Sequence, residues 1–326
     1  MRPAFSVIFL TTLIGAGQGL FLALVGGQFY RVIGAAKAPE TGVFFSYGSG
    51  LVLALLGAGL LASFFHLAHP ERAWRAASQW RTSWLSREVI ALPAVMGAVF
   101  VYGGLHWLGL NPVLVTFANA KTLDLTMALG YVGVAAVLAL FVCTGMIYGC
   151  MKFIQEWATP LTVLNFFLMG SASGLVLATV YADLMASGLA ELYAGFAMAM
   201  TVAALIGRTA SLWRNGNIKY MSSLQTAVGM HHRNLRQVTR GFTASAFNLK
   251  EFFHPGGPGM VAKMTALFLV LAFALPLLLM MVGLAEGLAP WFGLAFAVQY
   301  AGLLAERWVF FAEATHPQNL YYQKVA

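Results

Sequence analysis

The chain alternates long apolar stretches with short polar connections. A helix that crosses the bilayer needs about 20 mostly apolar residues, and eight stretches meet that length, at 5–33, 43–67, 88–110, 125–149, 161–182, 188–212, 262–284 and 288–311. They are too long and too continuous for the strands of a membrane barrel, which alternate in polarity over about ten residues. Helices must therefore satisfy the backbone. The pattern predicts an all-α polytopic membrane protein with eight transmembrane helices, and four plus four spans would allow two four-helix bundles.

Composition supports this class. Of 326 residues, 60% are hydrophobic and 9% are charged, and the mean hydropathy is +0.77, whereas soluble domains carry about 25% charged residues. The whole chain, 1–326, is expected to form a single integral membrane domain. The first span is longer than the 7–15 residues of a signal-peptide core, so it is expected to stay in the mature chain.

The basic residues lie almost entirely on one face of the predicted topology. Eight spans put both termini and the loops after spans 2, 4 and 6 on the same side, which then holds sixteen of the nineteen Lys and Arg. Only Arg31, Lys37 and Lys121 fall on the other side. Cytoplasmic loops carry such an excess, so both termini are predicted to be cytoplasmic. The net charge of +8 is thus a topology signal, and it does not indicate nucleic-acid binding.

The charged and metal-binding residue types limit the chemistry of the chain. No Asp, Glu, Lys or Arg stands near the middle of a predicted span, which argues against a transmembrane proton relay. Cys143 and Cys150 lack a C-x-x-C pattern and are interpreted as buried packing residues, so no Fe–S cluster or zinc site is expected. His66 and His106 are predicted to lie about 27 Å apart along the helix axes. They could not share one iron as axial haem ligands.

Two titratable residues flank one short polar loop, 68–87. His66 closes the second predicted span and Glu88 opens the third. A purely structural interpretation is available for both: Glu88 would follow Ser86 as a helix N-cap and be stabilised by the helix dipole, and His66 would be an interfacial histidine. Trp74, Trp80 and Trp84 would then form an aromatic belt. The pattern alone favours this structural interpretation.

A resemblance to a known family changes that balance. The stretches "HLAHPERAW" and "LSREV" around this loop resemble the signature of the membrane-anchor subunit of the dimethyl sulfoxide reductase family, and the similarity extends to the eight-span plan and to the tail "AERWVFFAEATHPQNLYY". Within the family, "FNLKEFFHPG" at 247–256 makes the chain most similar to the anchor of cytoplasmic sulfite dehydrogenases. The resemblance implies a multi-pass protein of the bacterial inner membrane.

The resemblance also implies a function and partners. A family member of this kind docks an Fe–S electron-transfer subunit, which contacts a molybdopterin catalytic subunit, and it exchanges electrons with ubiquinone or menaquinone without haem or metal of its own. His66 and Glu88 match the positions of the family's quinone site, and Arg72 and Arg75 lie in the matching loop. Sulfite oxidation that reduces quinone is the expected reaction, and a dimethyl sulfoxide-type reductase that oxidises menaquinol is the alternative.

The remaining polar sequence leaves two questions open. The loop 213–261 carries Arg233, Arg236 and Arg240 at a spacing that predicts one helical face, which would serve either lipid binding or docking of a cytoplasmic partner. A small-solute transporter is the rival from another class, supported by the polar runs "NFFLMGSASG" and "TMALGYVG".

Gly15 and Gly19, four residues apart, are interpreted as a helix-packing motif.

Overall fold

The computed structural model describes residues 1–33, 42–67, 69–116, 122–239, 258–287 and 289–321. Its long helices are α1 Phe5–Val32, α2 Gly42–Phe64, α3 Trp84–Leu108, α4 Leu125–Gly149, α5 Pro160–Leu184, α6 Ala190–Gly216 and α11 Ala289–Ala312. A further long helical segment consists of α9 Pro258–Leu269, the π-helical turn η3 Val270–Ala274 and α10 Leu275–Glu286. Short elements are the 3₁₀ helix η1 Pro70–Gln79, the helices α7 Leu224–Val228 and α12 Gln318–Tyr321, and two strands.

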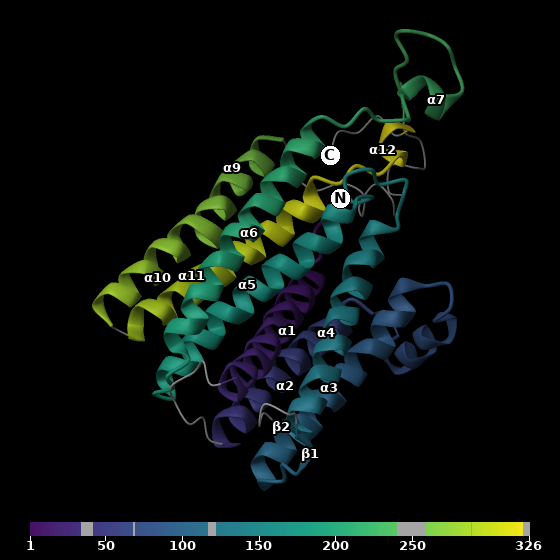
Figure 1. Ribbon diagram of the computed structural model, residues 1–326. Coiled ribbons are helices and arrows are strands. Elements are labelled where there is room, and N and C mark those ends of the chain that lie inside the picture. Colours follow the sequence, from purple (N-terminus) through teal and green to yellow (C-terminus); the bar gives the residue numbers. More distant parts are fainter. Residues whose placement is uncertain (34–41, 68, 117–121, 240–257, 288, 322–326) are drawn as a thin grey trace.

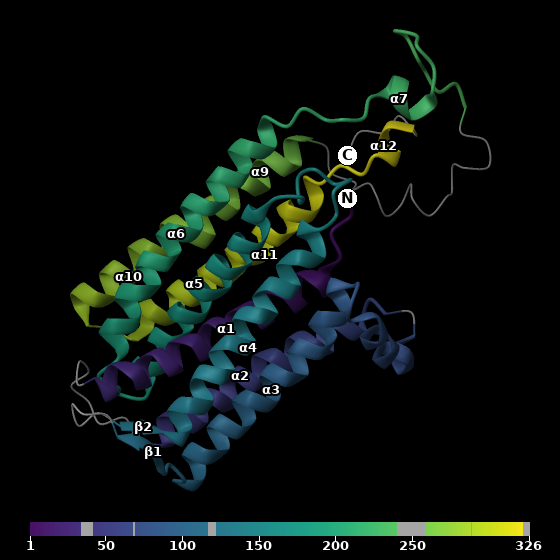
Figure 2. The same cartoon turned by 45° about the vertical axis from the view of Figure 1, so that its right-hand side comes forward.

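The long helices run side by side in two groups (Figures 1 and 2). Helices α1 to α4 pack as one group, and α5, α6, the α9–α10 segment and α11 pack as the other; α1 and α5 form the main contact between them. The N-terminus, α7 and α12 lie at one end of the molecule, and the strands lie at the opposite end (Figure 1). This arrangement is that of a polytopic helical membrane protein.

Seven helices in the described part of the chain are long and apolar enough to cross a membrane. They correspond to the first seven predicted spans. The eighth predicted span forms α11, which is 24 residues long and packs against α5, α9 and α10. Helix α11 contains the polar residues Gln299, Glu306 and Arg307. It is not among the seven helices that are long and apolar enough to cross a membrane.

Glycine residues bring α1 and α5 into close contact. A β-carbon on Gly19 would collide with the backbone oxygen of Gly170, and one on Gly174 would collide with the backbone of Gly19. Gly15 also faces Gly170. Small residues allow helices in a membrane to approach in this way, so the predicted packing role of Gly15 and Gly19 is confirmed. The run "GSASG" at 170–174, which supplied the transporter interpretation, is the other half of this interface.

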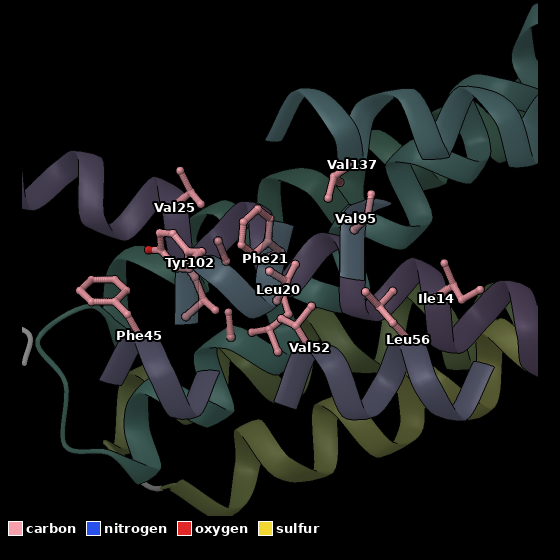
Figure 3. Packing of buried hydrophobic residues seen from close by; sticks show 14 of the residues in the cluster. Ile14, Leu20, Phe21, Val25, Phe45, Val52, Leu56, Val95, Tyr102 and Val137 are labelled. Atoms are coloured by element: carbon pink, nitrogen blue, oxygen red, sulfur yellow. The ribbon is translucent and has the colours of Figure 1, made fainter. Parts of the chain in front are cut away.

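The core of the first group is apolar and dense. Leu20, Phe21 and Val25 of α1 meet Val52 and Leu56 of α2, together with side chains of α3 and α4 (Figure 3). Phe21 and Tyr102 pack edge to face with ring centroids 5.4 Å apart. This packing fixes the positions of α3 and α4, whose ends carry the candidate site.

A π-helical turn interrupts the α9–α10 segment at the point where Gly302 of α11 packs against it. Pro276 lacks a backbone N–H and crowds the carbonyl four residues earlier, and the π-helical turn Val270–Ala274 directly precedes α10. Insertions of this kind widen a helix locally. A β-carbon on Gly302 of α11 would collide with the Ala272 backbone, so a glycine is required there.

The all-α architecture agrees with the prediction, and the structure adds one small antiparallel hairpin, β1 Val113–Thr116 with β2 Thr122–Asp124. One local prediction is wrong. The predicted basic helix does not form at Arg233 and Arg236, because α7 ends at Val228 and Gly229 adopts φ 73°. Arg240 and the motif at 247–256 lie outside the described residues.

Candidate functional site

Glu88 lies inside α3 and is buried between helices. The helix begins at Trp84, and Ser83 is the N-cap, whose hydroxyl accepts a hydrogen bond from the Ser86 backbone N–H. The prediction of Ser86 as N-cap is therefore wrong by three residues. Glu88 stands in the second turn and is 9% exposed, and its Oε1 accepts a 2.5 Å hydrogen bond from Thr144 Oγ1 of α4. Its place past the first turn weakens the interpretation of Glu88 as a helix-capping carboxylate.

His66 lies just beyond the end of α2. The helix ends at Phe64, and the backbone N–H of His66 bonds to the Ser63 carbonyl as the chain turns. The ring is exposed in part, yet burial still lowers its pKa below the usual value for histidine. In the described part of the chain, no hydrogen bond or ion pair joins His66 to Glu88.

The loop between the two residues is organised by its own side chains. Arg72 lies 3.7 Å from Glu71, which also contacts His69 at 3.1 Å. Arg75 lies over the Trp74 ring, 5.6 Å from its centroid. Trp74 is 71% exposed, so its apolar ring is available to lipid or to another molecule. The predicted loop 68–87 thus contains η1 and the first turn of α3, and position 68 is outside the described residues.

The structure contains a buried charge cluster that the sequence did not predict. Arg208 of α6 pairs with Glu306 of α11 at 2.7 Å and with Glu313 at 3.1 Å. Glu306 also pairs with Arg307 at 2.6 Å, and Glu306 is fully buried. Burial raises the pKa of Glu313 above its usual value despite the nearby Arg208.

A signal for this cluster was present in the sequence. Charged residues within an apolar span are costly unless they are paired, and Arg208 lies in the predicted span 188–212 while Glu306 and Arg307 lie in 288–311. All three lie near the ends of their helices that carry α7 and α12 (Figure 1). The midspan positions of the described helices carry no such residue, as the sequence indicates.

The end of the molecule that carries α7 also holds buried polar contacts. Glu156 accepts hydrogen bonds from the Tyr220 hydroxyl at 2.9 Å and from the Thr315 backbone N–H at 3.0 Å. Arg214 donates to the Gln155 carbonyl at 2.9 Å. These contacts attach the start of the predicted loop 213–261 to the connection between α4 and α5.

One further histidine and the two cysteines were also interpreted from the sequence. His106 packs at the opposite end of α3, against Phe45 and Tyr102, and Gly42 at the start of α2 lies beside it. The predicted separation of His66 and His106 is therefore confirmed. Cys143 is buried, whereas Cys150 follows the end of α4 and is exposed, so the prediction that both are packing residues is wrong for Cys150. The described residues hold no cluster of three or more His, Cys, Asp or Glu that could bind a metal ion.

Comparison with known proteins identifies the family. The model of the family described as DMSO reductase anchor subunit (DmsC) matches residues 1–313. The chain belongs to the DMSO reductase anchor subunit family. The match covers every long helix of the structure, including α11. Among curated proteins, the chain is 51% identical over 326 residues to a sulfite dehydrogenase subunit of Allochromatium vinosum, and the alignment covers 100% of both chains.

Membership of this family draws attention to the end of the bundle that carries α7 and α12. An anchor subunit must offer its partner subunits a contact surface. Exposed apolar side chains are found beyond the end of α6, at Tyr220, Met221, Met230 and Val238. They stand at the same end as His66, Glu88 and the charge cluster.

Proposed function

We propose that this protein is the quinone-reactive membrane anchor of a three-subunit molybdenum oxidoreductase that oxidises sulfite. The observation that carries the proposal is the 51% identity, over the full length of both chains, to the sulfite dehydrogenase subunit of Allochromatium vinosum. An Fe–S subunit would receive electrons from a molybdopterin subunit and pass them to quinone at the anchor. The anchor itself would supply the quinone site and the proton exchange.

The proposed orientation places all eight long helical segments across a bacterial inner membrane, with α11 as the eighth span. Both termini then lie in the cytoplasm, because sixteen of nineteen basic residues fall on that side. Helix α11 supports this count, since it is as long as the other spans and contacts α5 and α10 along its length. Its buried charges are paired, which makes them compatible with a membrane-spanning helix.

The proposed quinone site lies between His66 and Glu88 at the cytoplasmic end of α2 and α3. Reduction of a quinone takes two electrons and two protons, so groups that exchange protons must be nearby. Burial lowers the pKa of His66, which favours the neutral ring, and a neutral ring can donate one N–H to a quinone oxygen. Glu88 is positioned by Thr144 to exchange a proton on the inner side of the site.

Arg72 and Arg75 are proposed to orient the entrance of the site. Arg75 stacks on Trp74 and Arg72 pairs with Glu71, so both side chains are held on η1 at the edge of the membrane. Arginine side chains that stack on exposed aromatic rings keep their charge at the lipid headgroup level. We expect these two residues to affect quinone affinity more than the rate of electron transfer.

The loop 213–261 is proposed as the docking region for the Fe–S subunit. Its described part carries the exposed apolar residues Met221, Met230 and Val238 together with Arg233 and Arg236. Exposed apolar groups with basic neighbours suit an interface with an acidic protein surface. In the proposed orientation, the surface of the bilayer lies next to the helix ends, and this region lies on the cytoplasmic side of it.

Co-purification and a paired assay test the proposal. An affinity-tagged chain solubilised in mild detergent should retain an Fe–S subunit and a molybdopterin subunit. The complex should transfer electrons from sulfite to a short-chain quinone. A chain that purifies alone, with uptake of a solute into vesicles, would support a transporter instead. A complex that oxidises menaquinol with dimethyl sulfoxide and ignores sulfite would assign the alternative direction.

A further inference from the structure

A small internal cavity lies behind Glu88, between α1, α4, α5 and α11. Its volume is about 30 Å³, which is enough for about one water molecule. The polar residues around it are Thr11, Thr12, Gln18, Thr144, Ser173 and Arg307. Most of the lining is apolar, but these groups give a water molecule the polar partners that it needs.

Arg307 brings an unsatisfied donor to this cavity. Its side chain is 5% exposed. Nε pairs with Glu306 at 2.6 Å, and Nη2 contacts Met169 Sδ at 3.9 Å. Nη1 is buried and has no hydrogen-bond partner among the described residues. The guanidinium lies over the rings of Phe166 and Phe310, 4.2 and 4.8 Å from their centroids, and these contacts supply no hydrogen-bond acceptor. A buried donor without an acceptor is costly, and a water molecule in the cavity would satisfy it.

Thr144 lies on the cavity wall and contacts Glu88 on its other side. Its hydroxyl hydrogen is donated to Glu88 Oε1, so the lone pairs of Oγ1 remain available to accept a hydrogen bond. Tyr148, one turn further along α4, packs against Phe310 with ring centroids 5.4 Å apart, and Arg307 lies over the same Phe310 ring, 4.8 Å from its centroid. Glu88 and Arg307 are therefore both close to this stretch of α4, although they belong to different helix groups.

We propose that the cavity holds an ordered water that accepts from Arg307 Nη1 and donates to Thr144 Oγ1, so that Thr144 and Arg307 are positioning residues for proton exchange at Glu88. The proposal rests on the role of Glu88 given above. Arg307 keeps its proton throughout. The positive charge of Arg307 and the hydrogen bond from Thr144 both favour the ionised carboxylate of Glu88. The water connects these two effects, because it bonds to Arg307 and to Thr144.

Few other groups compete for this role. The titratable or charged side chains around Glu88 are Arg87 on its own helix, Cys143 and Tyr148 on α4, Arg307 on α11, and His66, which follows the end of α2 on the other side of the proposed quinone site. Helix α2 has only Tyr47, near its far end, and α1 has only Tyr30 and Arg31, also at the far end. The cation on the cavity side is therefore Arg307.

Infrared difference spectroscopy of the assembled complex tests the proposal without a quinone. The carbonyl band of protonated Glu88 is identified by its loss in Glu88→Gln, and its intensity is then followed against pH. In Thr144→Val and in Arg307→Met, the midpoint should rise by about one pH unit, the equivalent of one charge-assisted hydrogen bond. Arg307→Lys, which keeps the charge, should restore most of the shift.

Thr179→Val is the matched control. Thr179 is a buried threonine of α5 whose hydroxyl bonds only to the Leu175 carbonyl, and its loss should leave the midpoint unchanged. An unchanged midpoint in Arg307→Met would overturn the water bridge even if Thr144→Val shifted it. An equal shift in Thr179→Val would overturn it too. Normal quinone turnover in Glu88→Gln would instead refute the quinone site and leave the bridge standing.

Discussion

The hydroxyl of Thr144 on α4 donates a 2.5 Å hydrogen bond to the carboxylate of Glu88 on α3. This contact turns Glu88 toward the interior of the first helix group, whereas His66 stays at the surface beyond the end of α2. In the proposed quinone site, the two residues would therefore reach the quinone from different sides, His66 from the surface and Glu88 from the protein interior.

The topology can be tested by thiol labelling. In a background without Cys143 and Cys150, a cysteine at Ser223 should be protected from an impermeant reagent in spheroplasts, because the proposed orientation places α7 at the cytoplasmic end. A cysteine at Val115, in the hairpin at the opposite end, should react. Labelling of Ser223 together with protection of Val115 would reverse the orientation.

The contact between the two helix groups depends on Gly19. Gly19→Ala places a methyl group against the Gly170 carbonyl, and overpacking of this kind costs about 1–3 kcal/mol. We expect less assembled complex in the membrane and a lower thermal midpoint after purification. Gly26→Ala on the same helix is the control, since a β-carbon there has no neighbour within 4 Å. Equal yields for both variants would show that this interface tolerates a methyl group.

The buried charge cluster should contribute to stability as a unit. Glu306→Gln leaves Arg208 and Arg307 without their shared carboxylate, and removal of one partner from a buried ion pair costs about 3–5 kcal/mol. The thermal midpoint of the detergent-solubilised complex should fall well below that of Glu191→Gln, which changes an exposed glutamate at the start of α6. Similar midpoints would mean that the cluster is not a stability element.

The sequence could predict the helices but not the contacts between them. Apolar length located seven of the spans because each must cover the same bilayer thickness. Polarity along the chain did not indicate that Arg208 and Glu306 meet, since they lie on helices far apart in sequence. The N-cap of α3 was predicted at Ser86, but the helix begins three residues earlier, and Ser83 is the N-cap that accepts from the Ser86 N–H. Glu88 was found through its place in a motif, and its burial and its Thr144 partner depend on how α3 packs against α4.

The titration of His66 should be visible in the pH dependence of turnover. Burial lowers its pKa below the usual value of about 6.5, so its protonated form appears only at lower pH. Because that form can donate a proton to quinone, sulfite-to-quinone turnover should rise as pH falls toward the His66 pKa. His66→Gln retains a donor but cannot titrate, and it should remove this rise. The pH profile with a soluble dye acceptor should be the same in both proteins.

The most direct measurement is quinone-linked turnover per assembled complex in His66→Ala and Glu88→Gln. Both variants should assemble, retain their partner subunits and reduce a soluble dye with sulfite at the wild-type rate, since the dye takes electrons before they reach the anchor. Reduction of quinone should fall at least tenfold in each. Glu191→Gln, which changes an exposed glutamate in the first turn of α6, serves as the control and should keep normal quinone turnover. Quinone turnover close to wild type in both assembled variants would contradict the placement of the quinone site at His66 and Glu88.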